Sequence, residues 1–167
     1  IEIDTQLTSL IHPDTDNRYT ISAEVRDQSR RTIVGQGHVL VARQPFKVYA
    51  WTDRGHYRVG DTVQAGFKAQ TLAKKPVPGQ GILKLLRIVY EDNSPRETEV
   101  ARWQLDTDTE GRAAIQIQAS RAGQYRLSYQ ITDQKEHKIE GGYIFTVRSE
   151  GDDGTRYRFA KIELVPD

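Results

Sequence analysis

The 167-residue chain contains no cysteine, and neither sign of charge dominates it. Without cysteine it can form no disulfide, no thiol nucleophile and no cysteine-based metal site. The 24 basic and 23 acidic residues leave a formal net charge of +1, so no global field favours nucleic acid or an anionic membrane. No apolar run approaches the ~20 residues that a membrane-spanning helix needs, and residues 1–20 lack a signal-peptide pattern.

An initiator methionine is also missing, because the chain opens on Ile1. We interpret the sequence as a processed chain or as a piece of a longer one. A hydrophobic content of 37% with 28% charged residues is typical of a folded protein and argues against disorder. The length allows one full domain with additional segments, or two small domains.

No window of the sequence has a helical period, whereas apolar residues often alternate with a period of two. In residues 62–71, for example, Val63, Ala65, Phe67 and Ala69 share one face, as a half-buried strand requires. Two strands are predicted before Pro45, at 19–27 and 32–43. Seven more are predicted after it, at 46–51, 62–71, 81–90, 97–105, 113–117, 125–131 and 139–147.

Residues 81–90 are apolar at positions on both faces, which favours a strand covered on both sides. Some of these side chains could instead serve a neighbouring domain. Seven strands separated by turns predict an all-β fold, an antiparallel β-sandwich of the immunoglobulin or fibronectin type III class.

An internal repeat indicates the domain boundaries. Shifting the chain by 106 residues aligns 19–41 with 125–147 without a gap, and seven of these 23 positions are identical. Residues 1–44 are therefore predicted to be the last strands of a domain like the complete sandwich at 45–148. At a slightly larger shift 48–53 aligns with 162–167, so we expect residues 149–167 to be a linker and the first strand of a third domain. Repeated β-domains predict an elongated array.

An acidic run resembles the start of a calcium loop. Asp106, Asp108 and Glu110 have the required spacing, and Gly111 follows them. The twelfth position is Ile117 in place of glutamate, and the run joins two predicted strands, so we interpret it as a turn.

The remaining polar residues predict no catalytic, cofactor-binding or metal site. Four histidines (His12, His38, His56 and His137) lack ligand spacing. Ser120 and Ser149 do not lie in a nucleophile elbow. Arg54, His56 and Arg58 beside Trp51 and Tyr57 suggest a nucleic-acid or sugar platform, but strand alternation and loop solvation explain them more simply.

Several motifs, taken in order along the chain, resemble those of macroglobulin-type domains. Residues 52–54 (TDR) followed by 57–63 (YRVGDTV) resemble the opening of such a domain, although Val59 replaces the usual proline. Residues 105–113 (LDTDTEGRA) resemble the family's hairpin, and 123–147 resemble its last two strands. The turn at 29–35 and the tryptophan, aspartate, arginine and glycine of residues 51–55 are most similar to bacterial alpha-2-macroglobulins.

The resemblance implies a scaffold role without enzymatic activity. Members of this family string macroglobulin domains into a cage that closes on a protease after it cuts a bait segment, and many capture the protease through a thioester. A thioester needs a cysteine, and no long structureless insertion suggests a bait, so only the framework role carries over. The resemblance also implies a periplasmic or cell-envelope location. The implied partners are neighbouring macroglobulin-like domains and the proteases that the parent traps, with no cofactor, nucleic acid or membrane insertion.

Two other functions are compatible with repeated β-sandwich domains. One is an immunoglobulin-like adhesion or carbohydrate-binding repeat of a large cell-surface protein. The other is an accessory domain of a secreted hydrolase. Flanking sequence would separate the three.

Overall fold

A computed structural model describes residues 15–92 and 94–151. These residues form ten strands, β1 to β10, and no helix, so the all-β prediction is confirmed. None of the described residues belongs to a helix long and apolar enough to cross a membrane. The chain divides into two compact units, residues 1–46 and 47–167, which are described separately. The repeat match at 162–167 lies outside the described residues, as does His12.

The first unit contains an antiparallel hairpin of β1 (Asn17–Arg26) and β2 (Thr32–Val41). Its turn is held by Asp27, whose Oδ1 accepts hydrogen bonds from Ser29 Oγ (2.7 Å) and Arg31 N (2.9 Å). Because side chains alternate across a ribbon, one face of the hairpin is apolar. Four large side chains on this face are 37–69% exposed, namely Ile21, Val25, Ile33 and Val39.

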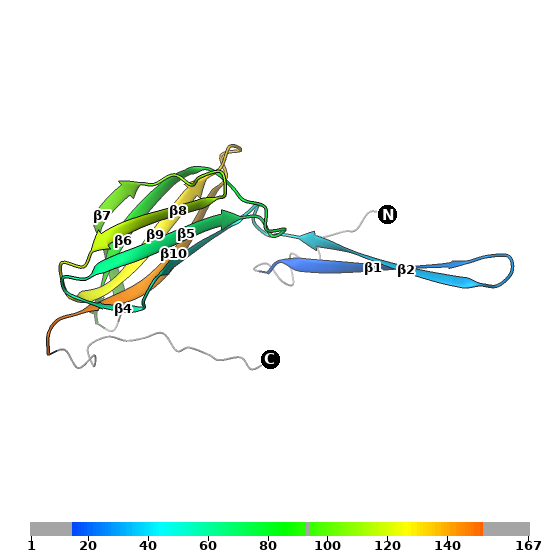
Figure 1. Cartoon of the computed structure of the whole chain (residues 1–167). Helices are drawn as coiled ribbons and strands as arrows, with labels where there is room; N and C mark the ends of the chain where they lie inside the picture. Colours follow the sequence, from blue (N-terminus) through cyan, green and yellow to red (C-terminus); the bar gives the residue numbers. More distant parts are fainter. Residues whose placement is uncertain (1–14, 93, 152–167) are drawn as a thin grey trace. The chain divides into compact units, whose positions relative to one another are not determined.

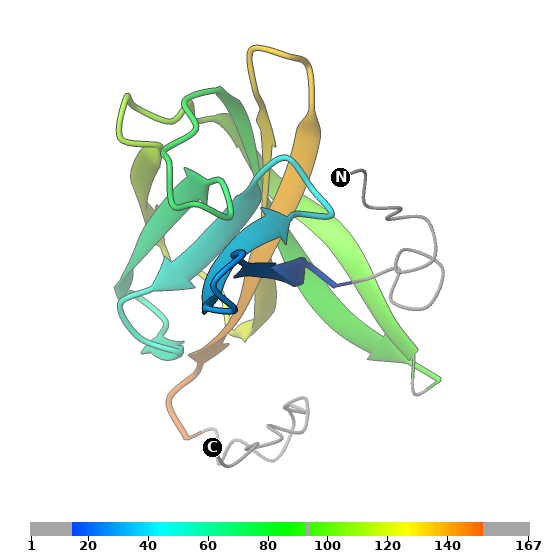
Figure 2. The same ribbon diagram turned by 90° about the vertical axis from the view of Figure 1, so that its right-hand side faces the viewer.

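The second unit is a sandwich of two sheets (Figures 1 and 2). One sheet has the strand order β4-β10-β9-β6-β7, and the other has the order β3-β5-β8. All pairs are antiparallel except β4 with β10. The strands are β3 (Lys47–Thr52), β4 (His56–Arg58), β5 (Thr62–Gln70), β6 (Gln80–Glu91), β7 (Ser94–Gln104), β8 (Arg112–Gln118), β9 (Gly123–Thr132) and β10 (Lys138–Arg148).

The core lies between the two sheets. Phe67 of β5 and Tyr129 of β9 are both fully buried, and their ring centroids lie 4.4 Å apart across the interface. Val63, Leu83 and Leu127 are also fully buried. Burying a large apolar side chain contributes about 1.5–3 kcal/mol, so contacts of this kind supply the main stabilisation of the sandwich.

Two details differ from the sequence prediction. Eight strands are present within 45–148 where seven are predicted, because the three residues of β4 are too few to produce a periodic pattern. β6 is not covered on both sides in the structure, since Ile82 and Val89 are 41% and 42% exposed. Because Ile82 and Val89 lie on opposite faces of the strand, neither face is covered over its whole length, although Leu83 and Leu85 are buried in the core.

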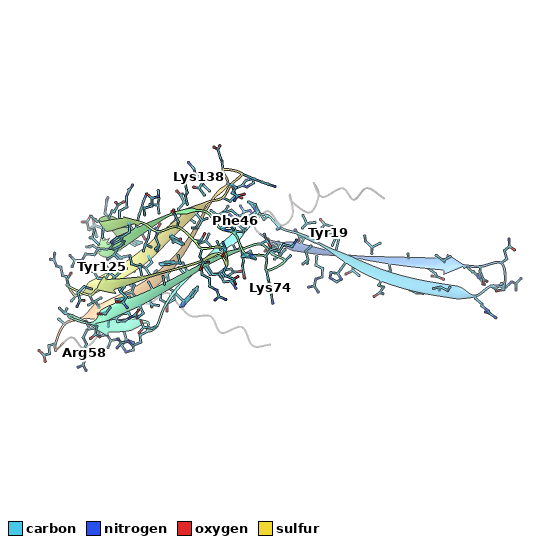
Figure 3. All side chains as sticks on the ribbon, turned by 45° about the horizontal axis from the view of Figure 1, so that its top comes forward. Tyr19, Phe46, Arg58, Lys74, Tyr125 and Lys138 are labelled. Carbon is cyan, nitrogen blue, oxygen red and sulfur yellow. The ribbon has the colours of Figure 1, made fainter. Side chains whose placement is uncertain are left out.

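The hairpin of the first unit has the same geometry as the β9–β10 hairpin. Tyr19 pairs with Val39 as Tyr125 pairs with Phe145, and every other pair of β1 and β2 has its counterpart at an offset of 106. The turns also correspond, because Asp133 Oδ1 accepts from Lys135 N and His137 N, both at 2.9 Å. The backbone φ is +64° at Arg30 and +63° at its counterpart Glu136. Tyr19 and Tyr125 are both labelled in Figure 3, and Tyr125 is buried.

Candidate functional site

The corner between β3 and β5 is organised by the carboxylate of Asp53. Its Oδ1 accepts hydrogen bonds from Tyr57 Oη (2.6 Å) and Gln64 N (3.0 Å). Its Oδ2 pairs with Arg54 Nε at 3.2 Å. Asp61 closes the next turn by accepting from Arg58 N at 2.9 Å. An ion pair of 3.7 Å between Arg54 and Asp61 joins the corner and this turn into one polar network.

Tyr57 ties this network to the core. Its side chain is 2% exposed, and its ring packs edge-to-face on Phe145 with centroids 5.7 Å apart. The Tyr57 hydroxyl also accepts from Arg54 N at 3.0 Å, and the Arg54 guanidinium lies 4.9 Å from the ring centroid. The hydrogen bond from Tyr57 lowers the pKa of Asp53. Burial, followed by the same hydrogen bond, raises the pKa of Tyr57.

These contacts leave no stacking platform for a base or a sugar at Tyr57. Its ring faces the core, and Arg54 is paired with two carboxylates, Asp53 and Asp61. Trp51 is 45% exposed but lies flat over Gly66 on the other strand, where an added Cβ would come within 2.6 Å of the indole. The indole covers a strand glycine, as aromatic side chains often do across strands.

The acidic run at 106–111 is used to build a turn. Asp108 Oδ1 accepts from Glu110 N (2.9 Å) and Arg112 N (2.8 Å). Asp106 Oδ1 accepts from Gly81 N at 3.0 Å, which joins the turn to β6. Gly111 has φ +68°, a conformation that favours glycine. The carboxylate oxygens named here are thus engaged by backbone N–H groups of the chain itself.

The described histidines lie in three separate elements. His38 lies in β2, His56 in β4, and His137 in the β9–β10 turn, where Nδ1 is 2.9 Å from Asp133 Oδ2. Within residues 15–92 and 94–151, no group of three or more histidine, aspartate or glutamate side chains could hold a metal ion. Ser120 and Ser149 are both exposed and lie after β8 and β10 respectively.

An ionic network crosses the outer face of the five-stranded sheet. Arg126 of β9 binds Glu97 of β7 through two bonds of 2.7 Å and Glu140 of β10 through one of 2.9 Å. The hydrogen bonds from Arg126 lower the pKa of Glu97. The pKa of Glu140 is also lowered, first by the hydrogen bond from Ser128 and then by Arg126. The network links strands on both sides of β6 and is structural.

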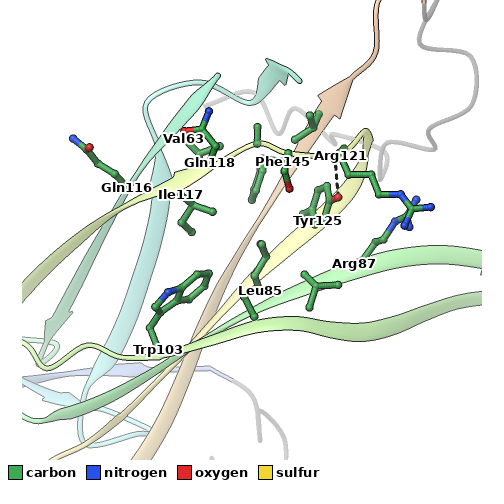
Figure 4. A pocket seen from close by; sticks show the side chains of 15 residues that line it. Val63, Leu85, Arg87, Trp103, Gln116, Ile117, Gln118, Arg121, Tyr125 and Phe145 are labelled. Carbon is green, nitrogen blue, oxygen red and sulfur yellow. Dashed lines mark hydrogen bonds between the residues drawn. The ribbon is translucent and has the colours of Figure 1, made fainter. Parts of the chain in front are cut away.

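A pocket of about 410 Å³ opens between the edge strands β7 and β8 (Figure 4). Its walls are mostly apolar and include Leu85, Trp103, Ile117 and Tyr125. Trp103 and Ile117 lie on opposite edge strands, one in each sheet. A register shift between β6 and β7 at Leu85 and Leu86 locally disrupts the pairing beside the pocket. Hydrogen bonds do not link the two edge strands, so the space between them is open to a ligand.

Two arginines lie at one end of this pocket, as Figure 4 shows. Arg87 pairs with Tyr125 in the register of β6 and β9, two positions after the buried pair of Leu85 and Leu127. Because side chains two apart share a face, Arg87 occupies a position that faces the core. Arg121, on the connection between β8 and β9, is exposed. The residues that line the pocket include no aspartate or glutamate.

Arg87 is the residue that the sequence prediction missed. It stands inside the apolar run 81–90, which was interpreted from its hydrophobic members alone. The available signal was its position, two residues after Leu85 on a core-facing row. A charged residue in such a row needs a partner.

Comparisons with known proteins identify no family. No protein-family model matches the sequence, and no curated protein matches it. Among solved structures, the sporulation control protein Spo0M from Bacillus subtilis has 10% identity and a TM-score of 0.44 over 62% of this chain and 49% of that protein. The chain thus spans about half the length of Spo0M.

Two further solved structures are similar at the same low level. A tetra-tandem repeat from the extending region of a large adhesion protein has 8% identity and a TM-score of 0.42, over 80% of this chain and 32% of that one. CopC from Methylosinus trichosporium OB3b has 14% identity and a TM-score of 0.37, over 59% and 87% respectively. Identities this low transfer no function.

Proposed function

We propose that this chain is a non-enzymatic framework segment of a larger protein built from tandem β-sandwich domains. The observation that carries the proposal is the correspondence of the β1–β2 and β9–β10 hairpins in register, turn hydrogen bonds and φ at an offset of 106. In the sandwich the β9–β10 hairpin supplies two central strands and about a third of the buried hydrophobic residues among the described ones. A second copy of it is the expected remnant of a second sandwich.

Gly35 supports this interpretation. Its counterpart Gly141 lies under β3, where an added Cβ would be 2.1 Å from the carbonyl oxygen of Val48. Glycine at 141 therefore permits a close approach of two strands. Gly35 has no atom within 4 Å of its own added Cβ. The described contacts therefore give no packing reason for glycine at position 35. A glycine at this position suits a strand of a preceding domain that packs on Gly35 as β3 packs on Gly141.

The class of the sandwich is part of the proposal. Sheets of the order β3-β5-β8 and β10-β9-β6-β7, with the short β4 beside β10, suit an immunoglobulin or fibronectin type III topology. In that assignment the domain is a macroglobulin-type domain, and the corner between β3 and β5, with Tyr57, closes its first turn.

The motif resemblance extends the proposal to the parent protein. We propose a bacterial alpha-2-macroglobulin located in the periplasm or cell envelope, which traps endopeptidases in a cage of such domains. The partners of this segment are then the adjoining domains, and the trapped protease is a partner of the whole cage. A tandem array would also suit an adhesion repeat, so the experiment has to separate the two.

The test is a trapping assay on the full-length parent. The parent is mixed with an endopeptidase, and cleavage of a large protein substrate is compared with cleavage of a small peptide substrate. Trapping predicts a loss of activity toward the large substrate only, whereas an adhesion repeat predicts unchanged cleavage of both. Residues 1–167 alone are expected to inhibit neither, and inhibition by this segment would contradict the framework role.

The array itself is tested at Gly35. Gly35→Ala is expected to destabilise a longer piece of the parent that includes the preceding domain, while leaving residues 1–167 as stable as before. Equal stability of both longer pieces, with and without the substitution, would mean that no strand covers this glycine.

A further inference from the structure

The guanidinium of Arg87, a half-buried residue, has one long hydrogen bond and one unpaired, shielded nitrogen. Its Nε is shielded from solvent and has no hydrogen-bond partner among the described residues. Its Nη2 reaches only the carbonyl oxygen of Ala122, at 3.5 Å. Gly123 leaves room for it, because a Cβ there would lie 3.2 Å from Nε. A buried arginine is normally paired with an anion, since burying a lone charge is costly.

The pocket beside Arg87 can hold that anion together with an apolar group. Its volume of about 410 Å³ is that of a small-molecule site. Trp103, Ile117 and Leu85 form its apolar walls. The guanidinium groups of Arg87 and Arg121 lie at the same end of it (Figure 4). With two cations and no carboxylate in the lining, the charge of the site is complementary to a monoanion with an apolar body.

We propose that the pocket between β7 and β8 binds a small organic carboxylate with an apolar tail. The carboxylate lies at Arg87 and Arg121, because the arginine fork matches two carboxylate oxygens. The tail lies between Trp103 and Ile117. This site goes beyond the framework role, and it can be tested whether or not the parent traps proteases.

The test is a titration of the 167-residue chain with sodium octanoate, followed by isothermal calorimetry and by Trp103 fluorescence. Trp51→Phe isolates the Trp103 signal, because Trp51 and Trp103 are the two tryptophans of the chain. Three comparison ligands separate the two parts of the recognition. 1-Octanol has the tail without the charge, acetate has the charge without the tail, and octyltrimethylammonium has the opposite charge.

We expect one octanoate to bind saturably, with a Kd at least about tenfold lower than that of 1-octanol. A charge-assisted hydrogen bond contributes enough free energy to produce a ratio of that size. Acetate and the ammonium compound are expected not to saturate. Arg87→Met should reduce octanoate binding to the level of octanol while keeping the fold, since methionine suits a core-facing position. Arg121→Gln, at an exposed position, should weaken octanoate at least about threefold, and Arg58→Gln in β4 is the matched control without effect.

Three outcomes would overturn the proposal. They are no saturable octanoate binding, equal affinity for octanoate and octanol, and octanoate binding that survives both Arg87→Met and Arg121→Gln. Melting curves of each variant establish that it is folded. If Arg87→Met does not fold, the comparison of Arg121→Gln with Arg58→Gln decides the question.

Discussion

The Tyr57 hydroxyl offers a direct test of how the corner between β3 and β5 stabilises the sandwich. Tyr57→Phe keeps the buried ring and its contact with Phe145 but removes the hydroxyl. That hydroxyl donates to Asp53 Oδ1 at 2.6 Å and accepts from Arg54 N at 3.0 Å. A hydrogen bond to a charged group contributes about 1.5–3 kcal/mol. Asp53 keeps its bond from Gln64 N, so we expect a loss of about 2 kcal/mol in the free energy of unfolding.

Two other tyrosines provide a graded comparison. Tyr125 donates to a neutral acceptor, the carbonyl oxygen of Arg121, at 2.9 Å, so Tyr125→Phe should cost about 1 kcal/mol. Tyr49 is 45% exposed, and Tyr49→Phe should change the stability by less than about 0.5 kcal/mol. Urea unfolding followed by tryptophan fluorescence reports on the sandwich, because Trp51 and Trp103 both belong to it. For a domain of this size, 2 kcal/mol corresponds to roughly 8–10 °C in Tm.

The pH dependence of the stability difference between wild type and Tyr57→Phe gives a second readout. The hydrogen bond from Tyr57 lowers the pKa of Asp53 in the folded state below its ordinary value of 3.8. A lowered carboxyl pKa stabilises the fold above the ordinary pKa, and that contribution is lost as the pH falls through the folded value. The gap between wild type and Tyr57→Phe should therefore narrow below about pH 4. A Tyr57→Phe variant within about 0.5 kcal/mol of wild type, or less affected than Tyr125→Phe, would refute the reasoning.

Three further predictions concern the rest of the fold. Gly141→Ala should cost about 3 kcal/mol in urea unfolding because its Cβ meets the Val48 carbonyl. Gly35→Ala in the same chain should be neutral or slightly stabilising, and equal costs for the two variants would contradict this expectation. Replacing Glu97 and Glu140 by glutamine should flatten the dependence of Tm on pH around and below 4.5, since both pKa values are lowered and their stabilisation is lost as the pH falls. If the dependence of Tm on pH stays unchanged in these variants, the ionic network of Arg126, Glu97 and Glu140 is not its source. Asp108→Ala should cost about 1–2 kcal/mol in the same assay by removing the acceptor of two backbone N–H groups, and a cost near zero would show that water replaces it.

Periodicity predicted the strands of the sandwich well because most of them have one face in the core. In β5, Val63, Ala65, Phe67 and Ala69 alternate with less buried residues, and all four are buried. The hairpin repeat was equally visible, since the residues that set its turn and its core face recur at one offset. β4 was not predicted because its strand character comes from pairing with β10, a contact far away in the sequence.

The pocket was beyond sequence reasoning for a different reason. A period of two tells which residues share a face, but it does not tell where two sheets separate at their edges. Leu85, Trp103 and Ile117 have the pattern of ordinary core residues, and only their positions on β6, β7 and β8 place them around a cavity. Arg87 was the exception that the pattern could have indicated, because a cation on a core-facing row needs a polar partner, and its Nε has none among the described residues.

The apolar face of the β1–β2 hairpin is largely exposed among the described residues. Ile131 at the core face of β9 is fully buried, whereas Val25 at the equivalent position of β1 is 62% exposed. Covering one such side chain contributes about 1.5–3 kcal/mol, and an isolated two-stranded hairpin is at best marginally stable in water. Four large apolar side chains on this face are therefore a strong driving force for a covering sheet. Under the proposed function that sheet belongs to the preceding domain and approaches most closely at Gly35, so the stability of this hairpin is a property of the array rather than of the segment.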